Sequence, residues 1–149
     1  LHMRIILFFI LFYFQINIAY SYDTYFLMLK NSKVNVRYGP SLKSPIKFIY
    51  KKKNLPIKII DKKENFRKII DHKNNGGWIH ISQLKKSSSL IILKETILFE
   101  KKTKFSKPIA KLEKGRLLII KKCILDWCKI KTENYEGWLK IKDVWGKKS

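Results

Sequence analysis

Two copies of one short sequence pattern lie in this chain, about 60 residues apart. Gly77-Trp78-Ile79-His80-Ile81 recurs as Gly137-Trp138-Leu139-Lys140-Ile141 at an offset of 60. Phe66-Arg67-Lys68-Ile69 recurs as Trp127-Cys128-Lys129-Ile130 at an offset of 61. A period of this size is longer than the repeats of solenoid proteins and leaves room for a complete small domain. The 149-residue chain is therefore expected to hold two similar miniature domains.

Each copy consists of short apolar runs separated by turn residues. The runs are rich in Ile, Val, Leu, Tyr and Trp, which is typical of strands in small antiparallel barrels. No segment has an apolar stripe of helical spacing over 11 or more residues. The predicted strands are Val34–Arg37, Ile46–Tyr50, Leu55–Asp61, Phe66–Asp71 and Gly77–Ile81, then Leu90–Lys94, Ile109–Leu112, Arg116–Lys121, Trp127–Lys131 and Glu136–Ile141. The sequence thus predicts an all-β protein.

Residues 1–21 differ from the rest of the chain and are predicted to form a secretory signal peptide. They contain 16 apolar side chains and one charged side chain, Arg4. Ile5–Phe14 is an unbroken apolar stretch of ten residues, shorter than the roughly 20 residues that span a bilayer. A small-x-small pattern then predicts cleavage between Ser21 and Tyr22. An uncleaved anchor is the alternative, because two further isoleucines extend the apolar stretch.

The chain has two cysteines, Cys123 and Cys128, in a C-x4-C spacing. In an oxidising compartment such a pair favours a disulfide over free thiols, which are the alternative. A metal site would need more soft ligands than two cysteines and the distant His72 and His80. The sequence predicts neither a metal site nor a cofactor.

The first copy opens with a motif that resembles the start of bacterial SH3-like domains. Val34-Asn35-Val36-Arg37-Tyr38-Gly39-Pro40-Ser41 is similar to their N-V-R-x-G-P-S opening, and the segments 66–69 and 77–79 match their later W-x-K-V and G-W-V motifs. The second copy departs from this pattern, with Ile97-Leu98-Phe99-Glu100 in place of the opening. The resemblance extends from about Phe26 to Gly146. It is to exported tandem SH3-like proteins of unassigned function, and it implies two small SH3-like β-barrels.

The predicted organisation follows from the repeat and the resemblance together. Residues 1–21 form the signal peptide, 26–84 the first SH3-like domain and 90–146 the second. The polar run 85–89 is the predicted linker.

The resemblance also implies an aromatic-lined groove. Phe66 and Trp127 stand where SH3-like domains place a groove aromatic, and His80 stands where eukaryotic SH3 domains have a groove proline. Tyr38 is expected to border the same groove. Such grooves bind extended peptides, because stiff rings bury area with little loss of entropy. The alternative for each aromatic is a place in the core.

Three tryptophans are assigned from strand alternation and chain position. Trp78 and Trp138 alternate with aliphatic neighbours, so they are expected on an outer face if the aliphatic side chains fill the barrels. There they either contact a ligand or pack between the two barrels. Trp145 is expected to plug the end of a barrel.

The charge is strongly positive. Lys and Arg number 33 against 11 Asp and Glu, so the formal net charge is +22, and it is still +21 without residues 1–21. Such a chain attracts polyanions. Export leaves acidic cell-wall polymers, lipopolysaccharide and anionic lipid headgroups as the available polyanions and argues against physiological nucleic acid. The lysines are dispersed, mostly at turns, so a merely solvated surface is the alternative.

These observations predict a non-enzymatic, exported protein of the periplasm or cell envelope. The sequence contains no G-x-S-x-G, H-E-x-x-H or P-loop motif. The expected ligand is peptidoglycan, its stem peptides or an envelope protein, bound in the SH3-like grooves. The alternative is a polycationic surface protein that binds anionic polymers or lipids non-specifically through its lysines. The sequence does not predict an oligomeric state.

Overall fold

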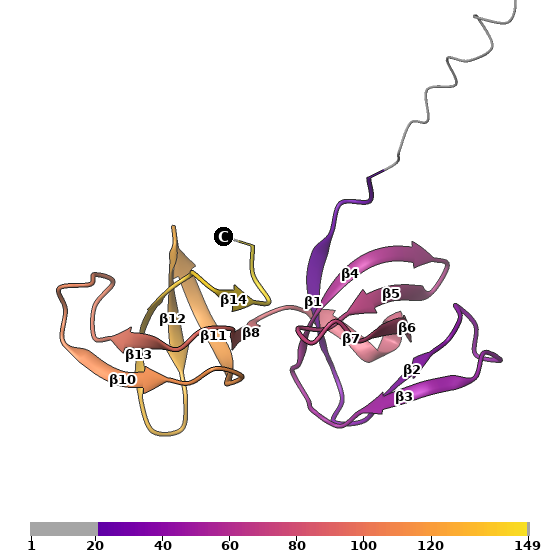
Figure 1. Cartoon of the computed structure of the whole chain (residues 1–149), viewed down its shortest axis with the longest axis horizontal. Coiled ribbons are helices and arrows are strands. Elements are labelled where there is room, and N and C mark those ends of the chain that lie inside the picture. Colours follow the sequence, from indigo (N-terminus) through magenta and orange to yellow (C-terminus); the bar gives the residue numbers. More distant parts are fainter. Residues whose placement is uncertain (1–20, 149) are drawn as a thin grey trace, which may run out of the picture.

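The computed structural model describes residues 21–148, which form two antiparallel sheets in tandem (Figure 1). The first barrel contains β1 (Tyr25–Leu29), β2 (Val34–Arg37), β3 (Ile46–Tyr50), β4 (Pro56–Lys63), β5 (Phe66–Ile70), β6 (Gly76–His80), the 3-10 turn η1 (Ile81–Gln83) and β7 (Leu84–Lys86). The second barrel contains β8 (Ser89–Ile92), β9 (Thr96–Phe99), β10 (Pro108–Leu112), β11 (Leu117–Ile124), β12 (Trp127–Lys131), β13 (Glu136–Lys140) and β14 (Val144–Trp145). The predicted signal peptide lies outside the described residues except for Ser21.

The two sheets have the same strand order. It is β3-β2-β6-β5-β4-β1-β7 in the first barrel and β10-β9-β13-β12-β11-β8-β14 in the second. Each strand of the first sheet therefore has one counterpart in the second, seven strands further along. The predicted all-β fold and the tandem arrangement of two similar units are confirmed.

Four strands appear in the structure that the sequence patterns did not predict: β1, β7, β9 and β14. The segment predicted as a linker is also shorter than 85–89. Lys85 and Lys86 pair with β1 as part of β7, and Ser89 already pairs with β11 as part of β8. Only Ser87 and Ser88 lie between the last strand of one barrel and the first strand of the next. The charged and polar side chains of this segment gave no strand pattern in the sequence. Backbone hydrogen bonds can hold an edge strand whatever its side chains are, so the strand forms without such a pattern.

Each barrel has its own aliphatic core. Ile57, Ile59, Ile69 and Ile79 are fully buried in the first, and their counterparts on β11, β12 and β13 fill the second. Because side chains alternate along a strand, burial of Ile79 turns its neighbours on β6 outward. This alternation presents Trp78 and His80 on the outer face.

The loop between β5 and β6 is organised by a buried carboxylate, Asp71. Its Oδ1 accepts hydrogen bonds from the backbone N–H groups of Lys73 (2.9 Å) and Asn75 (2.8 Å), and its Oδ2 accepts one from the Tyr50 hydroxyl (3.0 Å). Burial alone would raise the pKa of Asp71, but hydrogen bonds from Asn75, Tyr50 and Lys73 outweigh it and lower that pKa. Burial and the adjacent Asp71 raise the pKa of Tyr50, which keeps its hydroxyl a donor. Asp71 thus ties the loop to β3.

The two barrels share apolar contacts at their junction. Ile91 on β8 is 1% exposed and belongs to the core cluster of the first barrel, and Leu117 and Trp145 pack against that cluster. The Trp145 ring meets Phe26 edge to face, with 5.2 Å between centroids, and its Nε1–H donates to the Pro56 carbonyl at 2.9 Å. Trp145 was expected to plug a barrel end, but it lies between the barrels because β14 pairs with β8 beside the first core.

Polar and glycine contacts complete this junction. The hydroxyl of Ser89, a fully buried side chain, donates to the Asn54 carbonyl at 2.6 Å. Gly146 has a φ of +113°, and a Cβ there would come within 2.5 Å of the Ser89 carbonyl oxygen and 2.9 Å of Pro56 Cβ. A left-handed φ and this close approach both require glycine.

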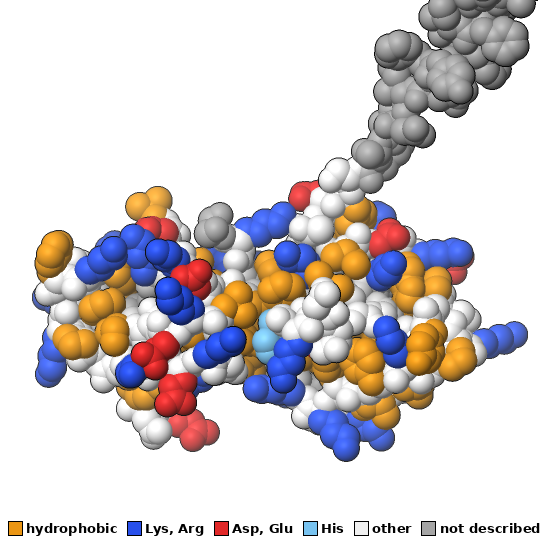
Figure 2. Space-filling model, in the orientation of Figure 1, with side chains coloured by type: hydrophobic (Ala, Val, Ile, Leu, Met, Phe, Trp, Pro, Cys, Tyr) orange, Lys and Arg blue, Asp and Glu red, His pale blue; other side chains and the backbone are white. Residues whose placement is uncertain are grey.

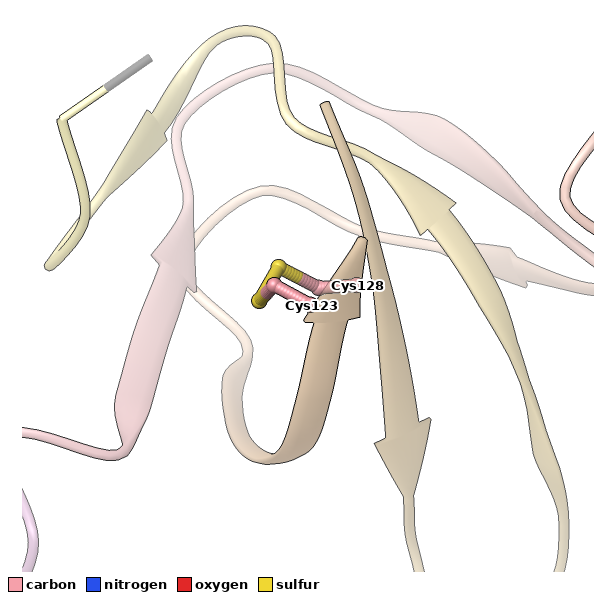
Figure 3. The surroundings of a disulfide bond; sticks show 2 residues. All are labelled: Cys123 and Cys128. Carbon is pink, nitrogen blue, oxygen red and sulfur yellow. A yellow bond between two sulfur atoms is a disulfide. The ribbon is translucent and has the colours of Figure 1, made fainter. Parts of the chain in front are cut away.

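Cys123 and Cys128 form a disulfide across the β11–β12 hairpin (Figure 3). The two residues are direct cross-strand partners, with 4.0 Å between their Cα atoms. The bond closes the end of the hairpin above the turn at Leu125 and Asp126.

Reduction of this disulfide is expected to lower the free energy of unfolding by about 2 kcal/mol, because the unfolded chain gains freedom when the bond is broken. The loss is no larger because the loop that the bond closes is short. Urea unfolding with and without dithiothreitol measures the difference. The double variant Cys123→Ala/Cys128→Ala is the control and should not respond to dithiothreitol. Equal stability of the oxidised and reduced protein would contradict the expectation.

Candidate functional site

A groove runs along the first barrel between the β2–β3 hairpin and the turn that follows β6. Its volume is about 540 Å³. We call it the first groove, and it is lined by Lys33, Asn35, Arg37, Leu42, Ile46, Ile49, His80, Ser82 and Gln83. Leu42, Ile46 and Ile49 are exposed apolar side chains, so the groove has an apolar wall and a polar wall.

The polar wall is held by hydrogen bonds and ring packing. Arg37 Nη1 donates to the Ser44 carbonyl at 2.8 Å, which fixes the guanidinium to the β2–β3 loop. His80 Nδ1 accepts from the Ser82 backbone N–H at 3.3 Å and lies 2.8 Å from the Ser82 hydroxyl. Phe66 meets the His80 ring edge to face, with 5.1 Å between centroids. Phe66 is itself buried, so it packs against the His80 ring from the barrel interior and does not line the groove.

Tyr38 does not border the first groove as the resemblance implied. It lines a separate recess of about 260 Å³ together with Lys47, Lys68 and Trp78, and Lys47 Nζ lies 5.7 Å from its ring centroid. The reason is alternation, because Arg37 faces the groove and the next residue faces the opposite way. The predicted residues therefore divide into two sites, with His80 and Phe66 at one and Tyr38 and Trp78 at the other.

Four of the groove-lining residues that the sequence did not predict lie on β2 and β3, and the others lie in loops or in η1. Asn35 alternates with the buried Val34 and Val36, and this pattern could have located it. Ile46 and Ile49 are three residues apart and could not be placed on one face by alternation. A β-bulge between them changes the alternation. Arg37 pairs with Ile46 and Val36 pairs with Phe48, so Lys47 has no partner in the register, and Ile46 and Ile49 come to lie on the same side of the strand.

The second barrel has a recess at the equivalent place. We call it the second groove; its volume is about 350 Å³ and it is lined by Thr96, Ile97, Phe99, Lys104, Lys140 and Lys142. The registers match, because Trp127 pairs with Lys140 as Phe66 pairs with His80. Trp127 meets Phe99 edge to face, with 6.1 Å between centroids. The same site is thus repeated with a different lining, an aromatic ring and three lysines.

Trp138 lies outside the second groove. Lys122 Nζ is 5.8 Å from its ring centroid, an arrangement like that of Lys47 and Tyr38 in the first barrel. In the described part of the chain, the tryptophan that packs against the other barrel's core is Trp145. Packing between barrels, one of the two roles expected for Trp78 and Trp138, therefore falls to Trp145.

Basic side chains spread over both barrels (Figure 2). Ion pairs join a few of them to acidic groups. The Glu136 carboxylate, for example, pairs with Lys129 Nζ at 2.7 Å and with Lys121 Nζ at 3.4 Å. The hydrogen bond from Lys129 is the main reason that the pKa of Glu136 is lowered. Within residues 21–148 no cluster of three or more potential metal ligands occurs. No described helix has the length and apolar character that a membrane span requires.

Solved structures that match this chain include NlpC2 and NlpC1 from Trichomonas vaginalis and an NlpC/P60 family protein from Bacillus cereus. Their identities to this chain are 12%, 11% and 12%, and their TM-scores are 0.38, 0.35 and 0.38. The matches cover 87%, 85% and 80% of this chain but 50%, 46% and 55% of those chains, so this chain spans about half their length. No curated protein sequence matches it.

The model of the bacterial SH3 domain matches the sequence twice, over residues 30–86 and 98–146. The two matches fall on the two sheets and together cover more than half of the chain. The chain therefore belongs to the bacterial SH3 domain family and carries the domain in two tandem copies.

Proposed function

We propose that this protein is an exported, non-enzymatic binding module of the cell envelope. Its ligand is peptidoglycan, a stem peptide of peptidoglycan or an envelope protein, and the first groove is the principal binding site. Bacterial SH3 domains are generally cell-wall binding modules and occur in exported or envelope proteins, which supports this assignment.

The observation that carries the proposal is the construction of the first groove. Ile46 and Ile49 lie exposed on one side, and Arg37 and His80 are held by hydrogen bonds on the other. Grooves with an apolar floor and a few fixed polar groups suit extended ligands that carry both kinds of group. Stem peptides, with small side chains and carboxylates, have this chemistry.

The tandem arrangement supports a polymeric ligand. A repeated surface would engage a repeating polymer at two points, and the second contact would then be intramolecular. The short Ser87–Ser88 connection and the apolar contacts at the junction limit the movement of one barrel relative to the other. A wall polymer offers many equivalent sites for such a pair.

Co-sedimentation with purified peptidoglycan tests the proposal. Residues 22–149, which contain the fourteen described strands, should sediment with the polymer at low salt and also at about 0.5 M salt, where charges are screened beyond roughly 4 Å. The double variant Ile49→Ala/His80→Ala should bind about tenfold more weakly, because it removes one contact from each wall.

Tyr38→Ala is the matched control, since it deletes an exposed ring outside the groove and should bind like the unchanged protein. Release of all protein at high salt, with no effect of the double variant, would show that the first groove is not the binding site. That result would favour the second candidate, binding of anionic polymers through dispersed lysines, for which the net charge of +22 is the supporting observation.

A further inference from the structure

The two most exposed large apolar side chains in the described part of the molecule belong to the second barrel. Phe105 is 100% exposed in the β9–β10 loop, and Leu125 is 92% exposed in the β11–β12 turn. Single exposed apolar residues are common, but a fully exposed phenylalanine and an almost fully exposed leucine at two loop tips of one small barrel are not. The β9–β10 loop lies at the end of the molecule away from the first barrel (Figure 1).

Both tips have defined conformations, the first through hydrogen bonds and the second through a turn that a disulfide closes. In the β9–β10 loop, Glu100 N–H donates to the Lys107 carbonyl at 2.9 Å, and Phe105 N–H donates to Thr103 Oγ1 at 3.3 Å. Leu125 has a left-handed φ of +52° in a turn that the Cys123–Cys128 disulfide closes. A leucine is disfavoured at such a φ and gains nothing from burial there. The exposed leucine therefore does not serve the stability of the turn.

The first barrel provides an internal comparison for both positions. Its β2–β3 loop has the same length and the same pattern of hydrogen bonds, with Lys43 N–H donating to Ser41 Oγ where Phe105 N–H donates to Thr103. Its β4–β5 turn places Glu64, at a φ of +49°, where the second barrel has Leu125. The backbone thus accepts charged residues at both sites, and only the second copy carries apolar ones.

Positive charge is concentrated in the loop that carries Phe105. The β9–β10 loop contains four lysines and one glutamate, whereas the equivalent loop 38–45 contains a single lysine. Lys104, the neighbour of Phe105 in the chain, lines the second groove together with Lys140, and Lys140 pairs with Asp126, the neighbour of Leu125, at 3.6 Å. The two apolar tips therefore flank a lysine-lined recess.

We propose that this end of the second barrel docks on an anionic phospholipid surface. Phe105 and Leu125 enter the interface between headgroups and acyl chains, and the lysines of the β9–β10 loop and the second groove contact the lipid phosphates. Exposed aromatic and aliphatic side chains next to lysines are the combination that partitions into an anionic bilayer surface. This site is separate from the first groove and does not depend on its ligand.

Vesicle co-sedimentation tests the proposal with residues 22–149. The protein should sediment with vesicles that contain phosphatidylglycerol, bind much less to pure phosphatidylcholine, and retain part of its binding at about 0.5 M salt. Phe105→Lys is the decisive variant, because it introduces the residue of the first copy and adds a positive charge. Insertion of the ring predicts about tenfold weaker binding, whereas attraction by charge alone predicts unchanged or tighter binding.

Leu125→Asn is the second variant and removes the apolar tip at a φ that asparagine tolerates. It should also weaken vesicle binding about tenfold, while Tyr38→Ala, an exposed ring on the other barrel, should leave it unchanged. Unchanged or tighter vesicle binding of Phe105→Lys overturns the proposal, and so does an absence of binding to phosphatidylglycerol vesicles. Loss of peptidoglycan binding in both tip variants, with vesicle binding intact, also overturns it and assigns the tips to a wall ligand. Failure of the first groove to bind peptidoglycan would leave these vesicle results unaffected.

Discussion

Replacement of Trp145 by alanine is expected to lower the free energy of unfolding by about 3 kcal/mol and to separate the unfolding of the two barrels. The variant loses the edge-to-face contact with Phe26 and leaves the Pro56 carbonyl without its donor. It also opens a cavity against Ile91 and Leu117, which join the first core from the second barrel. Each barrel has about 60 residues and a small core, so the free energy of unfolding of either barrel alone is expected to be small.

Differential scanning calorimetry measures both effects. The unchanged protein should unfold in one transition, and Trp145→Ala should show two, the first at a clearly lower temperature. Trp138→Ala is the matched control, because it removes a ring of the same size from an outer face away from the junction and should keep a single transition. One transition with an unaltered midpoint in Trp145→Ala would show that the barrels are coupled by other contacts.

Replacement of Asp71 by alanine is expected to lower the free energy of unfolding by about 3 kcal/mol. The change leaves four donors without the buried carboxylate that they now reach, namely the Tyr50 hydroxyl, the backbone N–H groups of Lys73 and Asn75, and the side-chain amide of Asn75. Urea unfolding at neutral pH measures the loss. Replacement of the exposed Asp23, which pairs only with Lys148 at the surface, is the control and should change stability by less than about 1 kcal/mol.

Asp71 should also contribute to sensitivity to acid. Its pKa is lowered by folding, so its stabilising effect is complete above the unfolded value near pH 4 and is lost as the pH falls through the lower folded pKa. The difference in stability between the unchanged protein and Asp71→Asn should therefore shrink as the pH falls below about 4. A constant difference over this range would refute a lowered pKa.

The repeat and the alternation of apolar residues were enough to predict the fold. Ile79 and Leu139 alternate with outward tryptophans in both copies, and burial of these aliphatic side chains fixed which face points inward. Short strands with polar sequences escaped prediction, because their pairing depends on a neighbouring strand and not on their own side chains. β7, with two lysines in three residues, is the clearest example.

The candidate site was predicted only in part. His80, a predicted groove residue, lines the first groove, and the Phe66 ring packs against it from the barrel interior. Tyr38 was misplaced by one position of alternation, and the bulge opposite Lys47 concealed that Ile46 and Ile49 share a wall. A bulge leaves no reliable trace in a single sequence.

The role of Trp145 could not be inferred from the repeat. The residues at the junction come from β1, β4, β8, β11 and β14, which are far apart in the chain. Sequence similarity between copies shows what each barrel needs for its own core, but the junction is asymmetric. One copy presents Phe26 and Pro56, and the other presents Ile91 and Trp145.

The position of β3 at the edge of its sheet has a consequence for solubility. An edge strand exposes unpaired backbone N–H and C=O groups, and β3 adds the exposed side chains of Ile46 and Ile49. Two molecules that met along this edge would bring together Lys47 and the run Lys51-Lys52-Lys53 of each. Repulsion between these like charges opposes growth of an intermolecular sheet, so the lysines protect the protein from aggregation whatever ligand it binds.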